Sequence, residues 1–294
     1  MTGTSERREV ACRMIDKQVS SRRACWWLGV SRSWLKYASV RSEKDKALLA
    51  RLMELSLANP TYGVRMLWAK LRQDGLVVNR KRVRRLCRLH GLLVRARRRR
   101  KRRGIGAGMP CRSEYPDHVW AYDFVEDGTE SGRKLRILTI IDEFTRRCIE
   151  VEVEHRMNAK FVARTLLRLF RARGAHGTPK FIRSDNGSEF IARSLMSVLK
   201  AQGVEARHID PGSPWQNGID ERFNGTLRRE LLDRETFHNR DHARALVKLY
   251  GRSYTNERPH SSLGYLTPLA FDAKWRRENG EAQEERRTAS PAAE

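Results

Sequence analysis

The sequence predicts an α/β protein in which a mixed five-stranded sheet flanked by helices follows an all-α region. Up to residue 94 the apolar residues recur mainly with helical spacing, whereas strand-like runs begin at residue 118. The balance of basic and acidic residues changes at a similar point in the chain. Residues 1–112 contain 30 Lys and Arg but 7 Asp and Glu, and residues 113–294 contain 30 and 28. A basic arm joined to a nearly neutral globular part is typical of proteins that bind nucleic acid.

The composition also excludes several classes of protein. No run of ~18 apolar residues exists, so no membrane-spanning helix is expected. The charged N-terminus, MTGTSERREV, has no apolar segment behind it and does not match a secretory signal. The five cysteines stand far apart without a CxxC pair, which argues against a disulfide framework and a structural zinc site. We therefore expect a reduced, cytoplasmic protein.

Residues 1–42 are predicted to form a helix-turn-helix domain. Residues 16–29 and 31–38 have the pattern of two short helices joined at Gly29, with Ser31 as the N-cap of the second. Ala24, Cys25 and Leu28 would face inward. In this motif the second helix enters the major groove. The side chains it would present to DNA are Arg32, Ser33 and Lys36.

Residues 43–94 are predicted to form a second helical, helix-turn-helix-like domain. Leu48, Leu49, Leu52 and Leu55 make residues 44–58 an amphipathic helix, and a further helix ends near Gly75. The third helix follows Asn79, with an apolar stripe of Val83, Leu86, Cys87 and Leu89. Its other face carries basic residues without an acid, which favours phosphate contacts over a merely solvated face. They are Arg80, Lys81, Arg82, Arg84, Arg85 and Arg88.

Residues 95–116 are predicted to form a basic linker. Eight of the nine positions 95–103 are basic, so this run is expected to be disordered when free and to order on a phosphate backbone. The residues assigned to this contact are Arg97, Arg98, Arg99, Arg100, Lys101, Arg102 and Arg103.

Residues 117–277 are predicted to form the globular core, followed by a disordered tail, 278–294. Strands at 118–125, 134–142 and 148–154 form an antiparallel meander, with Ile149, Val151 and Val153 on one face. Helices at 158–174 and around 190–203 then alternate with strands at 179–185 and 204–209, and a helix follows from residue 213. This order predicts a mixed sheet with helices on its faces.

Three acids fall where this layout would bring them together. Asp123 lies within a strand, Asp185 follows a strand end, and Asp220 and Glu221 open the helix after the last strand. Carboxylates gathered at one place repel each other unless a cation neutralises them. Oxygen ligands suit Mg²⁺ or Mn²⁺, and two such ions ~3.5–4 Å apart serve phosphodiester chemistry. The alternative is structural: Asp185 as a turn former and the other two as solvated helix charges.

Helical phase distinguishes Asp220 from Glu221. Ile219, Phe223 and Leu227 mark the face packed on the sheet. Glu221 belongs to a separate polar stripe, whose other members are expected to contact DNA: Asn217, Asn224 and Arg228. Asp220 lies near the packed face, where a local cap or an ion pair is expected.

Three further residues carry weaker expectations. Asp142 ends the second strand and is interpreted as structural, fixing the turn before Phe144. Glu189 is a lesser candidate for the same site as Asp185. His260 is expected to pack or to touch DNA rather than bind metal.

From about Cys12 to Phe271 the chain resembles the DDE transposase and retroviral integrase superfamily. The closer likeness is to the second-frame transposases of bacterial insertion sequences of the IS-three family. Besides WAYDF around Asp123, the motifs are NPTYGVRML (59–67), IIDEFTRR (140–147), SDNGSEF (184–190), QNGIDERFNGTLRREL (216–231) and NERPHSSLGYLTPLAF (256–271). The N-terminal His/Cys zinc module of retroviral integrases is missing, which favours the insertion-sequence branch.

The resemblance implies a ribonuclease H-like core and a function. Family members separate the last two acids by 35 residues and place a base seven positions after the Glu; here 35 residues lie between Asp185 and Glu221, and Arg228 is that base. Asp123, Asp185 and Glu221 would hold two Mg²⁺ or Mn²⁺ ions. The enzyme would cleave 3′ ends of the element and join them to target DNA without a covalent protein intermediate.

The implied partners are double-stranded DNA, both terminal inverted repeats and target, and further copies of the chain in a multimer on that DNA. The family often fuses this product to an upstream reading frame, whose protein would be another partner. The implied location is the bacterial nucleoid. Two alternatives stay open: a DNA-binding regulator with an inactive catalytic domain, and a structure-specific nuclease of the same fold.

Overall fold

A computed structural model describes residues 3–36, 40–94, 113–174, 177–184, 192–208 and 218–289. The chain divides into two compact units, Met1–Leu55 and Ser56–Glu294. None of the helices in these ranges is both long enough and apolar enough to cross a membrane.

The first unit begins with three short helices, α1 (Thr4–Asp16), α2 (Ser21–Leu28) and α3 (Arg32–Lys36). The predicted turn between α2 and α3 is present, because Gly29 adopts φ 62°, where a side chain would be strained. Ala24 and Cys25 are buried as expected, and Leu28 packs beside them partly buried. The sequence interpretation missed α1, whose buried Ala11 completes this small core. Ala11 is a small apolar residue in a charged segment, so the helical period is weak there.

Three further helices precede the sheet. α4 (Val40–Ala58) buries Leu48, Leu52 and Leu55. α5 (Val64–Gln73) and α6 (Arg80–Leu89) lie in the second unit. The expected N-cap of α6 is confirmed, since the Asn79 side chain accepts a hydrogen bond from the Lys81 N–H at 2.8 Å.

The sheet of the second unit has five strands in the order β3-β2-β1-β4-β5. The predicted meander is confirmed as β1 (Val119–Gly128), β2 (Lys134–Asp142) and β3 (Cys148–Glu154), paired antiparallel. β4 (Phe181–Ser184) pairs parallel with β1, and β5 (Glu205–His208) pairs parallel with β4. The mixed sheet predicted from the sequence is therefore present.

One expectation within the sheet is wrong. Val151 and Val153 pack on one face, but Ile149 packs on the other. The cause is a break in the β2–β3 register, where Ile140 pairs with Glu150 but Ile141 pairs with Cys148. Ile149 is the extra residue of this bulge, and an extra residue reverses the alternation of faces.

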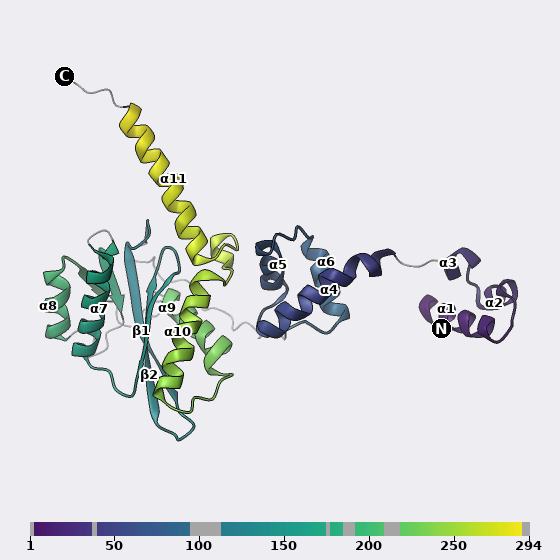
Figure 1. Ribbon diagram of the computed structural model, residues 1–294, viewed down its shortest axis with the longest axis horizontal. Helices are drawn as coiled ribbons and strands as arrows, with labels where there is room; N and C mark the ends of the chain where they lie inside the picture. The colour runs from purple at the N-terminus through teal and green to yellow at the C-terminus, as the bar shows by residue number, and fades with distance from the viewer. Residues whose placement is uncertain are drawn as a thin grey trace, which may run out of the picture. The chain divides into compact units, whose positions relative to one another are not determined.

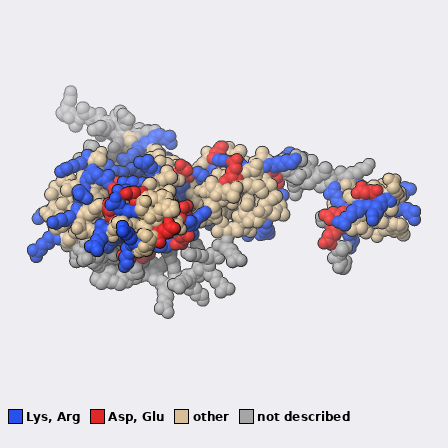
Figure 2. All heavy atoms as spheres, turned by 60° about the horizontal axis from the view of Figure 1, so that its bottom comes forward, with Lys and Arg blue, Asp and Glu red and all other residues tan. Residues whose placement is uncertain are grey.

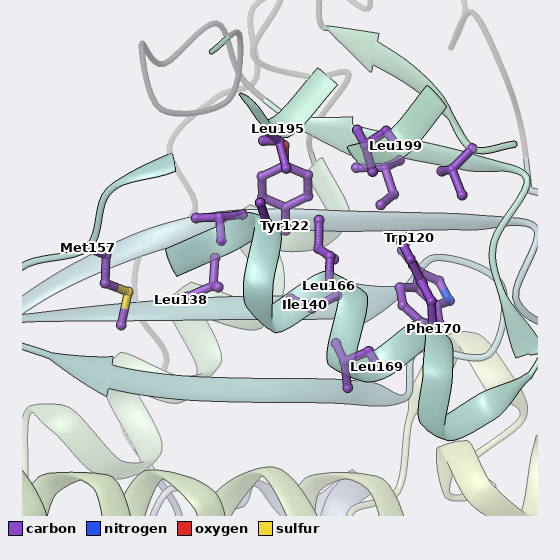
Figure 3. Close-up of a cluster of buried hydrophobic side chains, with 14 residues drawn as sticks. Trp120, Tyr122, Leu138, Ile140, Met157, Leu166, Leu169, Phe170, Leu195 and Leu199 are labelled. Carbon is purple, nitrogen blue, oxygen red and sulfur yellow. The ribbon is translucent and has the colours of Figure 1, made fainter. Parts of the chain in front are cut away.

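Helices cover both faces of the sheet (Figure 1). One face is covered by α7 (Ala159–Arg173) and α8 (Arg193–Ala201), and the other by α9 (Gly218–Leu227) and α10 (Arg240–Asn256). Figure 3 shows the first of these cores, where Trp120, Tyr122 and Leu138 of the sheet meet Leu166 and Leu195 of the helices. The second core contains Phe223 and Leu227 of α9, so the predicted packed face of this helix is confirmed.

The C-terminal segment differs from its prediction. α11 spans Pro268–Ala289, so residues 278–289 are helical where the sequence interpretation expected a disordered tail. This segment is rich in Glu, Arg, Gln and Ala, which favour helix, and it contains no proline. Polar composition alone therefore does not distinguish a solvent-exposed helix from a disordered tail.

Candidate active site and DNA-binding surfaces

Asp123 is half-buried in the middle of β1 and faces α9. Its Oδ1 accepts a hydrogen bond from the Phe124 N–H at 2.7 Å. Its other carboxylate oxygen, Oδ2, accepts a hydrogen bond from Asn224 Nδ2 at 2.8 Å. A carboxylate oxygen has lone pairs for more than one partner, so both oxygens can still take a metal ion.

Asn224 joins α9 to β1 and β2. Its Oδ1 accepts a hydrogen bond from Thr139 Oγ1 at 3.1 Å, and Thr139 lies opposite Asp123 in the β1–β2 register. With both ends of its amide held, Asn224 fixes the rotation of α9 against β1. The sequence interpretation assigned Asn224 to DNA and missed Thr139. The available signal was a lone polar residue inside the apolar run ILTII.

Glu221 lies one helical turn before Asn224 on the same side of α9, and it is exposed. Asp185 and Asn217 lie outside the described residues, as does Glu189. β4 ends at Ser184, the residue before Asp185, and Arg183 pairs in parallel with Ala121, two residues before Asp123. No group of three His, Cys, Asp or Glu residues suited to a metal occurs among the positions that the structure describes.

Asp142 is structural, as expected. Its carboxylate accepts hydrogen bonds from the N–H groups of Thr145 and Asp117 at 3.0 and 3.2 Å, and from the Thr145 hydroxyl. Burial raises the pKa of Asp142 to about 6, although the bonds from Thr145 oppose this shift. These bonds shape the turn in which Arg146 takes φ 66°.

Buried charges surround the start of α9. Glu143 accepts a hydrogen bond from Arg183 at 2.7 Å, and both side chains are almost completely buried. Asp220 is fully buried, and within the described residues neither of its carboxylate oxygens has a hydrogen-bond partner. The expectation that Asp220 forms a cap or an ion pair is therefore wrong. Burial raises the pKa of its carboxyl well above the ordinary value, and Asp123 and Glu143 raise it further.

A π-helical turn, Arg228–Leu232, continues α9. Its Glu230 forms a bidentate ion pair with Arg258, whose Nε and Nη2 donate to the two carboxylate oxygens at 2.9 and 2.8 Å. Glu230 also accepts a hydrogen bond from the Tyr250 hydroxyl at 3.2 Å. This pair gives the NERPHSSLGY motif a structural role, since it holds the π turn in place. Arg228, which opens the turn, donates to the Glu126 carbonyl at 2.6 Å and keeps an exposed side chain.

His260 packs, as one of its two expectations stated. Its ring meets the ring of Tyr254 edge-on at 4.7 Å, and its Nε2 is buried without a hydrogen-bond partner in the described part of the chain. Desolvation lowers the pKa of His260 to about 3, and the charge of Arg258 acts in the same direction. His260 is therefore neutral in the folded chain over the physiological range.

In the segment predicted to be the first helix-turn-helix, α3 is the helix that was expected to enter the major groove. Ser31 caps α3, because its Oγ accepts a hydrogen bond from the Trp34 N–H at 3.1 Å. Arg32 and Ser33 are exposed. The side chain of Lys36 lies outside what the structure describes.

α6 has a buried apolar stripe and an opposite basic face. Val83, Leu86 and Cys87 are buried, but Leu89 is 66% exposed, so its assignment to the stripe is wrong. Leu89 is the last residue of α6, beyond the packed turns. The basic residues that the structure exposes are Arg80, Lys81, Arg84, Arg85 and Arg88, with Arg82 half-buried. The basic run Arg97–Arg103 lies outside the described residues.

Comparison with known protein families identifies the domains of this chain. Two models described as integrase core domain match residues 113–214 and 202–268, and a model described as HTH-like domain matches residues 43–102. These matches imply that the chain binds DNA. Among solved structures, the magnesium-bound catalytic core of HTLV-2 integrase is 18% identical, with a TM-score of 0.43 over 55% of this chain and 99% of that one.

Curated relatives match over most of their length. The insertion element IS407 31.7 kDa protein of Burkholderia multivorans is 40% identical over 258 residues, covering 88% of this chain and 92% of the relative. The IS476 39.2 kDa protein of Xanthomonas euvesicatoria is 36% identical, covering 92% and 78%. The transposase of IS904 from Lactococcus lactis is 29% identical, covering 72% and 87%. The chain thus belongs to the IS-three family of insertion-sequence transposases, polynucleotidyl transferases of the DDE type built on an integrase catalytic core.

Proposed function

We propose that this transposase cleaves DNA at the ends of its insertion element and joins the freed 3′ ends to target DNA, using Asp123, Asp185 and Glu221 to hold two Mg²⁺ or Mn²⁺ ions. The observation that carries the proposal is the Asn224–Asp123 hydrogen bond of 2.8 Å, which brings the side of α9 that carries Glu221 against the strand that carries Asp123. The parallel β1–β4 pairing supports including Asp185, which follows β4 directly.

The side chains present suit divalent metal ions of this kind. Asp123 and Glu221 offer hard carboxylate oxygens, and no thiol or imidazole is needed for such ions. Bound divalent ions would neutralise the repulsion among the carboxylates, activate the attacking oxygen and stabilise the leaving one. Asp123 would contribute to holding both ions, and Asp185 and Glu221 would contribute to holding one each.

The other residues position the DNA. Arg228 is exposed and anchored through the Glu126 carbonyl, and it would contact the backbone beside the scissile phosphate. The exposed basic faces of α3 and α6 and the run Arg97–Arg103 would supply sequence-independent phosphate contacts. Because two ends must be held together, the active form would be a multimer on DNA at the nucleoid. An upstream-frame fusion partner stays a prediction.

Incubation with labelled element ends and Mg²⁺ tests the proposal. Joined products are expected, whereas cutting without joining would indicate a nuclease and binding without cutting a regulator. Asp185→Ala and Glu221→Gln should abolish both steps while DNA binding persists. Glu126→Gln, which changes an exposed acid on β1, is the matched control and should join normally. Strand transfer by the Asp185→Ala protein would contradict the assignment.

A further inference from the structure

One side of α5 is attached to the catalytic core by aromatic and polar contacts within the second unit. The Trp68 ring meets the Tyr265 ring edge-on, with the ring centres 5.6 Å apart. Lys70 Nζ donates a hydrogen bond to the Glu257 carbonyl at 3.3 Å. Figure 2 shows that Lys and Arg cover much of the core surface in that view, with Asp and Glu in smaller groups between them. A contact built on aromatic rings is therefore distinct from the charged surface seen there.

Tyr62, two residues before α5 begins, belongs to the same contact. It is 7% exposed, and the Arg258 guanidinium lies 5.8 Å from the centre of its ring, within the range of a cation–π interaction. Burial raises the pKa of the Tyr62 phenol, and the negative charge of Glu230 raises it further. Tyr62 thus lies close to both members of the Arg258–Glu230 ion pair.

This ion pair is almost closed to water. The side chains of Arg258 and Glu230 are 14% and 8% exposed. Charge attraction and hydrogen bonds are stronger where the local dielectric constant is low, so water that reaches the pair would weaken it. The Tyr254 ring, which belongs to α10, also lies 5.5 Å from the Arg258 guanidinium. The segment that carries α5 adds the Tyr62 ring to this enclosure.

The ion pair supports the π turn Arg228–Leu232, which contains Glu230. A π turn closes its hydrogen bonds one residue later than an α-helix, is rare, and is frequent at functional sites. Relaxing it would rotate the side chains at its ends relative to the helix before it. Arg228 opens the turn and donates to the Glu126 carbonyl at 2.6 Å, and Glu221 lies two helical turns earlier on α9. Loss of the support at Glu230 would therefore shift Arg228 relative to Glu221.

We propose that Tyr62 is a positioning residue of the catalytic centre, because its ring closes over Arg258 and so keeps in place the π turn that carries Arg228. The proposal rests on the proposed function, since it takes Arg228 and Glu221 to act on the same DNA strand. Trp68 supports Tyr62 by holding α5 against the core. The segment matched as an HTH-like domain would thus complete the fold around the catalytic centre as well as bind DNA.

The first test compares Tyr62→Ala with Tyr62→Phe in the full chain. Joining of labelled element ends in Mg²⁺ is measured as kcat and KM. Tyr62→Ala should lower kcat at least about tenfold and leave KM within about twofold, because the reacting groups are misplaced while the DNA contacts stay. Tyr62→Phe should restore kcat, since the ring over Arg258 is kept. A Tyr62→Phe protein as slow as Tyr62→Ala, or a Tyr62→Ala protein with the wild-type kcat, would overturn the proposal.

A matched control separates the role of Tyr62 from a general weakening of the helices beside it. Val83→Ala shortens a fully buried side chain of α6 and should keep the wild-type kcat at a temperature where the chain is folded. A loss of kcat equal to that of Tyr62→Ala would show that any weakening of these helices is sufficient, which contradicts a specific role for Tyr62.

A double-mutant cycle tests whether Tyr62 acts through Arg258. Arg258→Lys keeps the positive charge but loses the bidentate geometry, so it should lower kcat. Adding Tyr62→Ala to Arg258→Lys should lower kcat much less than it does in the wild type, because the pair that Tyr62 encloses is already weakened. Losses that multiply as independent effects would show that Tyr62 does not act through Arg258.

Hydrogen exchange gives a readout that does not depend on activity. The Asp233 N–H donates to the Arg228 carbonyl at 2.7 Å across the π turn. Peptides that cover this turn should exchange several-fold faster in Tyr62→Ala than in the wild type, whereas peptides from β2 should be unchanged. Equal exchange at the turn would contradict the proposal. Joining by the Glu221→Gln protein would instead refute the catalytic assignment, so the two failures are distinguishable.

Discussion

The two faces of the sheet are built differently. Under α7 and α8 an apolar core runs from Trp120 on β1 to Leu199 on α8, and the carboxylate buried beside it, Asp117, is partnered by the Trp120 indole N–H and by Arg173. Under α9 a comparable apolar core continues into buried charges, with Arg183, Glu143 and Asp220 all below 4% exposure. Burying charge is costly unless it is paired, and Asp220 has no hydrogen-bond partner among the residues described. The comparison indicates that buried charge is compensated on the first face, whereas the second gives up stability at Asp220, next to the strand ends where the chemistry is proposed.

The largest expected effect comes from the charged face. Asp123→Ala should lower strand transfer by at least about a thousandfold, because ordered divalent ions contribute several kcal/mol to the barrier. DNA binding should remain within about twofold, since phosphate contacts elsewhere supply it. Gel assays of joining and binding on one preparation separate the two quantities. If Asp123→Ala loses binding as well as joining, the residue is structural and the two faces differ less than the geometry indicates.

Breaking the Glu143–Arg183 pair should have the next largest effect. Arg183→Ala leaves a buried carboxylate without its partner and should cost about 3–5 kcal/mol in the free energy of unfolding of the core. Leu166→Ala, on the apolar face, should cost about 2–5 kcal/mol through a cavity. Denaturant unfolding measures both.

The double variant Glu143→Leu/Arg183→Met tests whether the buried charges of the α9 face serve stability or strand transfer. Stability should return to near that of the wild type, because a buried ion pair can often be replaced by packed apolar groups without loss. Strand transfer should stay impaired if the pair positions the end of β4. A double variant as unstable as Arg183→Ala would show that volume, not charge, decides the outcome.

A smaller effect, on how the free energy of unfolding depends on pH, is expected from His260, which lies on the same side of the sheet. Its pKa is about 3 when folded, against 6.5 for an unperturbed histidine, so the unfolded chain binds the extra proton first. Stability should therefore be fully present above pH 6.5 and be lost as the pH falls from 6.5 towards 3, by about 1.4 kcal/mol at pH 5.5. His260→Phe should remove this dependence, as measured by urea unfolding at pH 7.5 and 5.5. A wild-type/variant difference that is the same at both pH values would mean that folding does not lower the pKa of His260.

Much of this structure follows from local patterns in the sequence. Strands such as KLRILTIID have an apolar run of strand length with clear ends, and the structure begins and ends β2 at the predicted residues. The helical phase of Phe223 and Leu227 correctly gave the packed face of α9. These features depend on neighbours in the chain, which the sequence displays.

Features that depend on distant residues were missed. Asp220 was expected to find a local partner, but the charges that act on it come from Asp123, Glu143 and Arg183, far away in sequence. The bulge at Ile149 depends on how β3 pairs with β2, and nothing in CIEVEVE marks it. The role of Thr139 likewise appears only when Asn224, 85 residues later, is placed beside it.

The smallest prediction tests whether the difference between the faces is confined to the buried charges. Asn158 caps α7 by accepting from the Phe161 N–H at 3.0 Å, and Asn239 caps α10 by accepting from the His242 N–H at 2.9 Å. Each replacement by Ala should cost about 1 kcal/mol in the free energy of unfolding, because capping is local, and Asn→Asp should restore most of it. Urea unfolding of the two Ala variants should give equal losses, one on each side of the sheet. An Asn239→Ala loss several times that of Asn158→Ala would show that the charged face is marginal throughout, and not only at Asp220 and its neighbours.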